Sequence, residues 1–224
     1  MVRVLQVGET PYCHAMSCMA SWHAERCAGH QPDRLFLLTH PPTITHGRRV
    51  DPTTLPTSTV SRPVLSTDRG GSATYHGPGQ IIGYLVADVS RHRPADVVSG
   101  VCRTVAAALQ RHGFDAHAHT DLRLPPQLSG VWTERNRKIA SIGMRIERGV
   151  SRHGFALNVE TDLAEFRRFS PCGLAGETMT SLREMAEDRG VSPPSVPEVM
   201  RWISHVFQAV DIEHITSPRG PIPI

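Results

Sequence analysis

Lysine is almost absent from this chain of 224 residues. Lysine and arginine together number 24, and Lys138 is the one lysine among them. A bias toward arginine can reflect codon usage alone, but a single retained lysine indicates a position where a guanidinium would not serve. Arginine stays protonated at any accessible pH, whereas a buried ε-amine can lose its proton and act as a base. Lys138 is therefore a candidate catalytic residue.

The chain also lacks the features of secreted and membrane proteins. It has no apolar run that approaches the length of a membrane span, and residues 1–8 have the pattern of a strand rather than of a signal peptide. Its five cysteines are an odd number without a Cys-x-x-Cys pair, which argues against a disulfide framework. We expect a cytoplasmic protein with reduced thiols and no membrane partner.

Charge and length narrow the classes further. The formal net charge is +3 and the arginines are dispersed, which is too weak a basic signature for a nucleic-acid partner. A modest basic surface would instead suit an acidic protein partner. A chain of 224 residues can bury a real core, and we expect a single domain over residues 1–224 with a loose tail over residues 217–224.

Hydrophobic periodicity predicts both helices and strands along the chain. The last three predicted strands should be successive antiparallel neighbours, because short turns join them. Residues 49–61, rich in threonine and proline, should form a surface loop. The expected helices cover residues 12–29, 94–113, 162–169, 180–189 and 196–210. The expected strands cover residues 1–8, 35–39, 81–89, 114–119, 130–133, 138–147 and 151–159.

Two residues in the second half of the chain carry the most chemistry. In a strand of period two, Lys138 lies on the same face as the apolar Ala140 and Ile142, so its side chain should be buried. Cys172 lies in a loop of small and rigid residues, where a nearby ammonium would favour the reactive thiolate. The alternative is that Lys138 is a solvated residue at a strand start and Cys172 a small buried hydrophobe.

A second unusual segment is rich in glycine. Residues 68–80 contain four glycines and one proline, so their backbone can approach a ligand closely and offer its N–H groups to an anion or oxyanion. A plain connecting loop is the alternative, but such loops seldom place arginine, threonine, tyrosine and histidine between glycines. We therefore predict a binding function for this segment.

Histidines and cysteines cluster in two places without forming a metal site. His117 and His119 share one face of a short strand, which supplies too few ligands. The spacings in and after the first predicted helix match no zinc pattern, so core packing with solvated histidines is the better account. The residues there are Cys13, His14, Cys18, His23, Cys27 and His30. We expect no metal and no cofactor.

Taken together, these segments resemble the octanoyltransferases of lipoate biosynthesis, which move an octanoyl group from acyl carrier protein to a lysine of lipoyl domains. The motifs occur in the order of that family from residue 12 to about residue 182. They are His40-Pro41-Pro42 with Gly47-Arg48-Arg49, Arg69-Gly70-Gly71, residues 74–80, Gly130-Val131-Trp132, residues 138–143, residues 153–158 and residues 171–174.

The resemblance implies a fold, a reaction and partners. The fold would be α+β, with a mixed, largely antiparallel sheet flanked by helices as in biotin and lipoate protein ligases. The donor would be acyl carrier protein with octanoyl on its phosphopantetheine. The acceptors would be the lipoyl domains of 2-oxo acid dehydrogenases and the H protein of glycine cleavage. The reaction would be the first step of endogenous lipoate assembly and would need no ATP.

The resemblance also implies roles for individual residues. Cys172 would be the nucleophile that accepts the acyl group, and Lys138 would be its acid/base partner. His153 and Gly173 are additional candidates for the site. The residues expected to line the acyl and thioester pocket are Arg69, Gly70, Gly71, Ser72, Ala73, Thr74, Tyr75, His76, Ser141, Ile142, Gly143, Gly154, Phe155 and Ala156.

Several alternatives stay open at this point. His76 or His153 could replace Lys138 as the base, which would make a Cys–His pair. The chain could be an ATP-dependent lipoate or biotin-type protein ligase, which needs no cysteine, or a non-catalytic module that binds carrier proteins. Residues 169–170 and His46 depart from the family pattern, which could alter the acyl chain or the acceptor.

Overall fold

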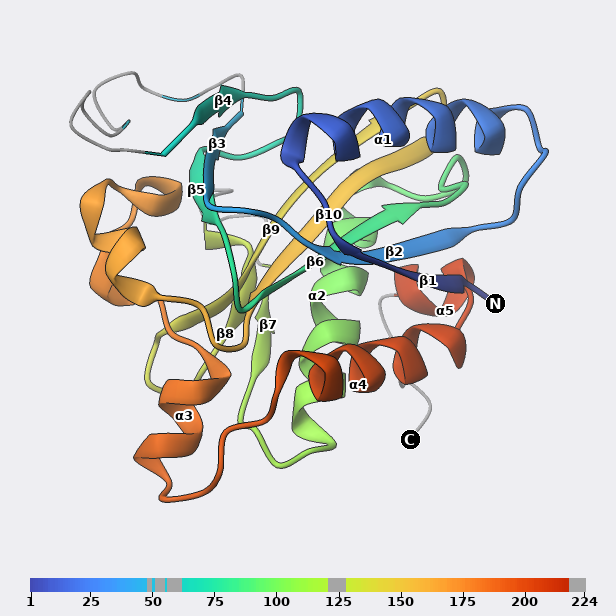
Figure 1. The fold of residues 1–224 in the computed structure, drawn as a ribbon. Coiled ribbons are helices and arrows are strands. Elements are labelled where there is room, and N and C mark those ends of the chain that lie inside the picture. The colour runs from blue at the N-terminus through green and yellow to red at the C-terminus, as the bar shows by residue number, and fades with distance from the viewer. Residues whose placement is uncertain (48–49, 51–54, 56–61, 121–127, 218–224) are drawn as a thin grey trace.

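A seven-stranded sheet forms the centre of the computed structural model, which describes residues 1–47, 50, 55, 62–120 and 128–217 (Figure 1). The strand order is β1-β2-β6-β10-β9-β8-β7. β1 and β2 run parallel, and each of the other neighbouring pairs is antiparallel. The predicted α+β class with a mixed, largely antiparallel sheet is confirmed. The strands are β1 Arg3–Glu9, β2 Arg34–Thr39, β6 Gln80–Val86, β7 His117–His119, β8 Gly130–Trp132, β9 Lys138–Glu147 and β10 Val150–Asn158.

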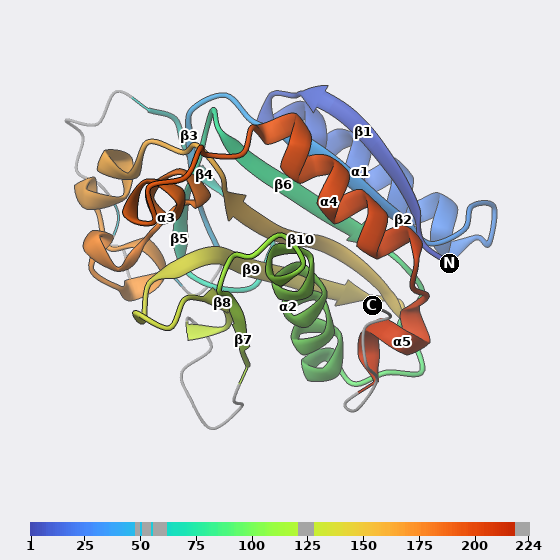
Figure 2. The ribbon, with the colours of Figure 1, turned by 90° about the horizontal axis from the view of Figure 1, so that it is seen from below.

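Helices cover both faces of this sheet (Figures 1 and 2). Ala15 and Met19 of α1 share one apolar cluster with Ile82 of β6. The other face lies under α2, α4 and α5, where Leu85 of β6 belongs to the larger core and Phe155 stacks on Phe207. Because successive residues of β6 point into two cores, this strand is apolar on both faces. The helices are α1 Tyr12–Cys27, α2 Pro94–Gln110, α3 Leu182–Asp188, α4 Val196–Gln208 and α5 Ile212–Thr216.

A second, three-stranded sheet has the order β4-β3-β5 and extends from one end of the large sheet (Figure 1). Its strands are β3 Thr43–His46, β4 Val64–Ser66 and β5 Ala73–His76. Ile44 and Tyr75 form a small core with Phe166 and Met179. Gly79, at φ 80, makes the turn from β5 into β6, and a Cβ at this position would meet the backbone of Glu160 at 2.6 Å. The glycine-rich segment is thereby carried from the small sheet to the large one.

The β9–β10 hairpin brings two predicted pocket segments together. Arg148 and Gly149 form its turn at φ 52 and φ 76, and positive φ at both central residues is what a two-residue type I′ turn requires. In this register, Ala156 pairs with Ser141 and Gly154 pairs with Gly143. Residues 141–143 and 154–156 therefore lie side by side.

Most predicted elements are present with shorter ends. The predicted helix over residues 12–29 ends at Cys27, and the one over residues 162–169 is the 3-10 helix η3 Leu163–Arg168. The predicted loop over 49–61 and the tail over 217–224 lie almost entirely outside the described residues. Among the described helices, none is both long and apolar enough to cross a membrane.

Candidate active site

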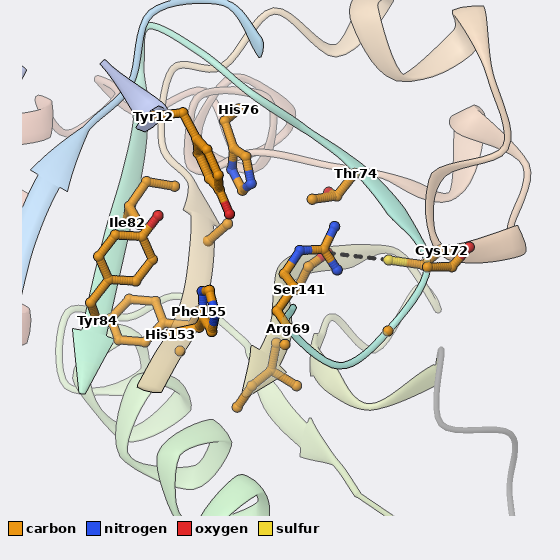
Figure 3. A pocket seen from close by; sticks show the side chains of 16 residues that line it. Tyr12, Arg69, Thr74, His76, Ile82, Tyr84, Ser141, His153, Phe155 and Cys172 are labelled. Carbon is orange, nitrogen blue, oxygen red and sulfur yellow. Dashed lines mark hydrogen bonds between the residues drawn. The ribbon is translucent and has the colours of Figure 1, made fainter. Parts of the chain in front are cut away.

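A pocket lies where the start of α1, the β5–β6 segment, the β9–β10 hairpin and the loop of Cys172 meet (Figure 3). Its empty space amounts to about 540 Å³, part of which is open to solvent. Ile82, Phe155 and Ala156 supply apolar wall, and Arg69 and Cys172 supply reactive or charged groups. Such a lining suits an apolar ligand with a polar reactive end.

The structure brings most of the predicted site residues to this pocket. Those that line it are Cys172, His153, Arg69, Gly71, Ser72, Thr74, His76, Ser141, Ile142, Gly143, Gly154, Phe155 and Ala156. The predicted residues that do not line it are Lys138, Gly70, Ala73, Tyr75 and Gly173. The ring of Tyr75 instead packs edge-on against Phe166 in the small core.

Cys172 lies in the 3-10 turn η4 Pro171–Gly173 at φ 55 and ψ 24. Residues other than glycine seldom adopt this left-handed conformation, and such strain concentrates at functional sites. The sulfur lies 3.9 Å from Ser141 Oγ (Figure 3). The N–H of Gly173 donates to the carbonyl of Ser170 at 3.1 Å, so this N–H is not available to an oxyanion in this conformation.

Lys138 has one of the most deeply buried side chains, with 1 % exposed, so the predicted burial is confirmed. The prediction that it shares a face with Ala140 and Ile142 is wrong, because Lys138 pairs with Trp132 and lies on the opposite face. The strand is irregular at this point, because Val131 pairs with Ala140 while Trp132 pairs with Lys138. The extra residue in β9 breaks strict alternation, as a β-bulge does. The N–H of Thr180 donates to the carbonyl of Lys138 at 3.0 Å and ties this bulge to the segment before α3.

The side chain of Lys138 passes over Gly130 of the neighbouring strand. A Cβ at Gly130 would lie 2.7 Å from Lys138 Cε and 3.4 Å from Nζ. Gly130 pairs with Ser141, and directly opposed residues of an antiparallel pair project to the same face of the sheet. The amine therefore lies on the face of Ser141, whose hydroxyl contacts Cys172. Nζ also lies 5.6 Å from the centre of the Trp132 ring, within reach of a cation–π interaction.

His76 is held by hydrogen bonds at both ring nitrogens. Nδ1 lies 2.9 Å from Gln80 Oε1, and Nε2 lies 3.1 Å from Thr45 Oγ1. Gln80 Nε2 donates to Asn158 Oδ1, which orients the amide so that His76 Nδ1–H donates and Nε2 accepts from the Thr45 hydroxyl. Burial holds the pKa of His76 well below its ordinary value. This neutral ring has no free nitrogen with which to take a proton from Cys172.

His153 is committed to a carboxylate. Its Nε2 lies 2.7 Å from Asp68 Oδ1, and a carboxylate can only accept this bond, so Nε2 carries the hydrogen. Burial lowers the pKa of His153 although Asp68 opposes this shift. Burial alone would raise the pKa of Asp68, but the bond from His153 and the charges of Arg152 and Arg145 hold it below its ordinary value. Among the described residues, no hydrogen bond joins His153 to Cys172.

Three pocket residues were missed by sequence reasoning, namely Tyr12, Ile82 and Tyr84. His40 Nδ1–H donates to the carbonyl of Thr10 at 2.6 Å, so His40 Nε2 accepts the Tyr84 hydroxyl at 2.8 Å. Burial raises the pKa of Tyr12 to about 12 and that of Tyr84 well above its ordinary value. Tyr84 could have been found from the sequence, because it places a hydroxyl in a strand that is otherwise apolar on both faces. Tyr12 was missed because its position in the helical pattern assigned it to the apolar core.

The two departures from the family pattern lie away from the pocket lining. His46 Nδ1 is 3.3 Å from the carbonyl of Gly47, and the Phe169 ring lies 6.5 Å from that of Phe166 in the small core. Within the described part of the chain, no group of three or more histidine, cysteine, aspartate and glutamate side chains could hold a metal ion. The reactive group that lines the pocket is the thiol of Cys172, and the guanidinium of Arg69 and the hydroxyl of Ser141 are hydrogen-bond donors in the same lining.

The fold is the one seen in solved structures of lipoate protein ligases. A bi-partite lipoate protein ligase from Thermoplasma acidophilum matches with a TM-score of 0.62 at 17% identity, over 91% of this chain and 80% of its own. Lipoate-protein ligase A bound with ATP matches with a TM-score of 0.59 at 14% identity, over 96% of this chain and 98% of its own. At these identities the likeness concerns the fold.

Sequence comparison gives the family. The lipoyl protein ligase A/B catalytic domain matches residues 11–208. An octanoyltransferase from Acidothermus cellulolyticus is 43% identical over 218 residues, covering 95% of this chain and 96% of the relative. An octanoyltransferase from Cellvibrio japonicus is 37% identical over 207 residues, covering 91% and 89%. The chain belongs to the lipoyl protein ligase A/B catalytic domain family, and within it to the octanoyltransferases.

Proposed function

We propose that this protein moves an octanoyl group from acyl carrier protein to a lysine of lipoyl domains through a thioester on Cys172. Membership of the octanoyltransferases supports the acyl group and the class of acceptor. The observation that carries the proposal is the sulfur of Cys172 in a pocket with Ile82, Phe155 and Ala156 in its wall. An octanoyl chain on this sulfur would find apolar surface beside it, and the pocket opening would admit a pantetheine arm.

In the first step, the Cys172 thiolate attacks the carbonyl carbon of the donor thioester. A carbon–sulfur bond to Cys172 forms, and the bond to the pantetheine sulfur breaks. Lys138 as an ammonium gives its proton to the departing pantetheine sulfur and is left neutral. One thioester replaces another, so this step is close to energy-neutral and needs no nucleotide.

In the second step, the amine of the acceptor lysine attacks the Cys172 thioester. A carbon–nitrogen bond forms, the carbon–sulfur bond breaks, and the thiolate of Cys172 returns. The neutral Lys138 takes the proton that the attacking nitrogen loses. Conversion of a thioester to an amide makes this step downhill. The proposed acceptors are the lipoyl domains of 2-oxo acid dehydrogenases and the H protein of glycine cleavage.

The hydrogen bonds of the site favour lysine over histidine as the acid/base group. Both ring nitrogens of His76 have partners, whereas His153 donates to Asp68 through Nε2 and keeps an Nδ1 that has no partner among the described residues. The amine of Lys138 lies on the same sheet face as Ser141, which contacts the sulfur. A Cys–Lys pair therefore has more support than a Cys–His pair.

The proposal is tested by incubating the protein with octanoyl acyl carrier protein in the absence of ATP and weighing it intact. We expect the mass of one octanoyl group, mapped to Cys172 after digestion, and loss of this mass when an apo lipoyl domain is added. Cys172→Ala should carry no acyl mass, while Cys13→Ala, which removes an exposed thiol, should behave as the wild type. Strict dependence on ATP would instead support a ligase, and absence of any adduct in wild-type protein that still binds acyl carrier protein would support a binding module.

A further inference from the structure

Arg69 carries a buried positive charge that no carboxylate balances within the described residues. The residue is 9 % exposed, and its hydrogen-bond partners are neutral oxygens: Nη1 donates to the carbonyl of Gly70 at 2.9 Å, and Nη2 donates to the carbonyl and hydroxyl of Thr45 at 2.8 and 3.0 Å. Its Nε has no partner in the described part of the chain, where it also forms no ion pair. The comparably buried Arg34 has Glu25 at 2.9 Å.

A buried charge without a counter-ion is costly, and such charges are normally paired. The guanidinium cannot escape this cost by losing its proton, since it stays charged at any accessible pH. An anion supplied by the pocket would offset this cost. The structure therefore points to an anion that forms inside the pocket during the reaction cycle.

The pocket lining offers few groups that can become this anion. Besides the histidines His76 and His153, its titratable residues are Tyr12, Tyr84 and Cys172. Burial raises the pKa of Tyr12 to about 12 and that of Tyr84 well above its ordinary value, so both phenols keep their protons. Cys172 is the lining residue that is left to carry the negative charge.

The geometry brings the guanidinium and the sulfur to one strand. A Cβ at Gly143 would lie 3.3 Å from Arg69 Cδ and 3.5 Å from Nη1, so the guanidinium lies against this glycine. Cys172 Sγ lies 3.9 Å from Ser141 Oγ, two residues earlier on the same face of β9. Two residues of a strand span about 7 Å, so the guanidinium of Arg69 and the sulfur of Cys172 are separated by a distance of about this size. Figure 3 shows both side chains beside Ser141.

We propose that Arg69 is the fixed cation that holds the Cys172 sulfur as a thiolate, an inference that rests on the nucleophile assigned above. A permanent positive charge close to a sulfur favours its thiolate form. The two cations then have separate roles: Arg69 supplies charge at every stage, while Lys138 can alternate between ammonium and amine. Gly71 and Gly143 leave the space that the guanidinium occupies.

The test measures the sulfur directly and needs no acyl transfer. Alkylation of Cys172 by iodoacetamide is followed from pH 5 to pH 10 by peptide mass spectrometry, with the exposed Cys13 as reference thiol in the same sample. In Arg69→Met, we expect the pH of half-maximal Cys172 alkylation to rise by about one to two pH units, the size that one charge at about 7 Å produces in a site of intermediate dielectric. Arg69→Lys should lie nearer the wild type, and Cys13 should not change.

Two further variants keep the test decisive. Arg145→Met removes an arginine of β9, the strand of Ser141 and Gly143, whose charge Asp68 already balances at 2.8 Å. It should shift the pH profile of Cys172 alkylation by less than half as much as Arg69→Met does. Thr45→Val preserves the charge of Arg69 but removes one anchor of Nη2, and we expect a smaller rise in the same direction, which can be read even if Arg69→Met does not fold. Coincident Cys172 profiles for wild type, Arg69→Met and Thr45→Val would overturn the proposal. That result would leave octanoyl transfer itself untouched, because the acyl adduct is measured separately.

Discussion

Gly130 lies directly beneath the side chain of Lys138. A Cβ at this glycine would come within 2.7 Å of Lys138 Cε and would also clash with the carbonyl oxygen of Ala140. The absence of a side chain at Gly130 is therefore what allows the buried lysine to cross β8 and reach the face of Ser141. A glycine in a strand otherwise weakens it, so its presence here has a positional reason.

Gly130→Ala should misplace the lysine. The added methyl group meets backbone as well as the lysine stem, so we expect a loss of about 1–3 kcal/mol in the free energy of unfolding. A displacement of about 1 Å at a catalytic group costs up to about a hundredfold in rate, so kcat for acyl transfer should fall roughly ten- to a hundredfold. Urea denaturation and steady-state assays measure the two effects.

The matched control for this substitution is Gly190→Ala. Gly190 has φ 65, and a Cβ at this position would have no atom within 4 Å, so alanine there carries backbone strain but touches nothing. It should lower stability with unchanged kcat. A Gly130→Ala protein with the kcat of the wild type would contradict the proposed path of the lysine side chain.

Lys138→Met and Lys138→Arg test the acid/base role. Methionine fills the buried space without a charge, and arginine retains the charge but cannot give up a proton. Both should lower acyl transfer by about 10²–10⁴, the usual contribution of a general acid/base group. Steady-state acyl-transfer assays measure this loss, and urea denaturation shows whether each variant folds.

Arg183→Met provides a control for loss of one positive charge, since its side chain is 48% exposed and bonds Glu160 on the surface. It should leave acyl transfer unchanged. Near wild-type transfer by Lys138→Arg would show that charge alone suffices at this position and would remove the lysine from the proton-transfer steps.

Acid should destabilise the protein through its buried histidines. Burial holds the pKa values of His40, His76 and His153 below the ordinary value of 6.5. A folded-state pKa below the unfolded value means that the unfolded chain binds more protons, so the stability is present above pH 6.5 and is lost as the pH falls below it. Each such histidine can cost up to about 1.4 kcal/mol per pH unit in that range.

Urea denaturation at pH 7.5, 6.5 and 5.5 measures this loss. His40→Gln should flatten the dependence, whereas replacement of the exposed His30 by glutamine should preserve it. Because the pKa of Asp68 is lowered in the folded protein, its contribution to the free energy of unfolding is lost in a separate pH range, below its ordinary value of 3.8. A free energy of unfolding that stays level from pH 7.5 to pH 5.5 would contradict the buried neutral histidines.

The strands of the site were predictable because the alternation or the run of apolar residues in each one indicates which of its faces are buried. Alternation over residues 138–147 and 151–159, with Arg148 and Gly149 between them, predicts the hairpin that the structure contains. The run of apolar residues in β6 predicts a central strand. The bulge at Lys138 was not predictable, because it arises from pairing with β8, and local alternation does not report on pairing.

The histidines also separate what the sequence predicts from what only the tertiary structure determines. Sequence alone left His76 and His153 as possible bases, since a histidine next to a glycine-rich turn suits catalysis and structure equally. Thr45 and Gln80 occupy both ring nitrogens of His76, whereas Asp68 takes Nε2 of His153 and leaves its Nδ1 without a partner among the described residues. These partners are 31, 4 and 85 positions away from the histidines they bind, so only folding brings most of them together.

By itself, the sequence determined most helices and the strands of the large sheet, the lone lysine and the candidate thiol, because composition and periodicity are local properties of a chain. The α+β class followed from the resemblance of the motifs to a family, and the three strands of the small sheet were not predicted. Tertiary structure alone decided that Gly130 makes room for Lys138, that Ser141 meets Cys172, and that the charge of Arg69 is buried among neutral oxygens. Each of these depends on the register of strands and loops that are distant in sequence. Such registers are set by how the whole core packs, which no single segment encodes.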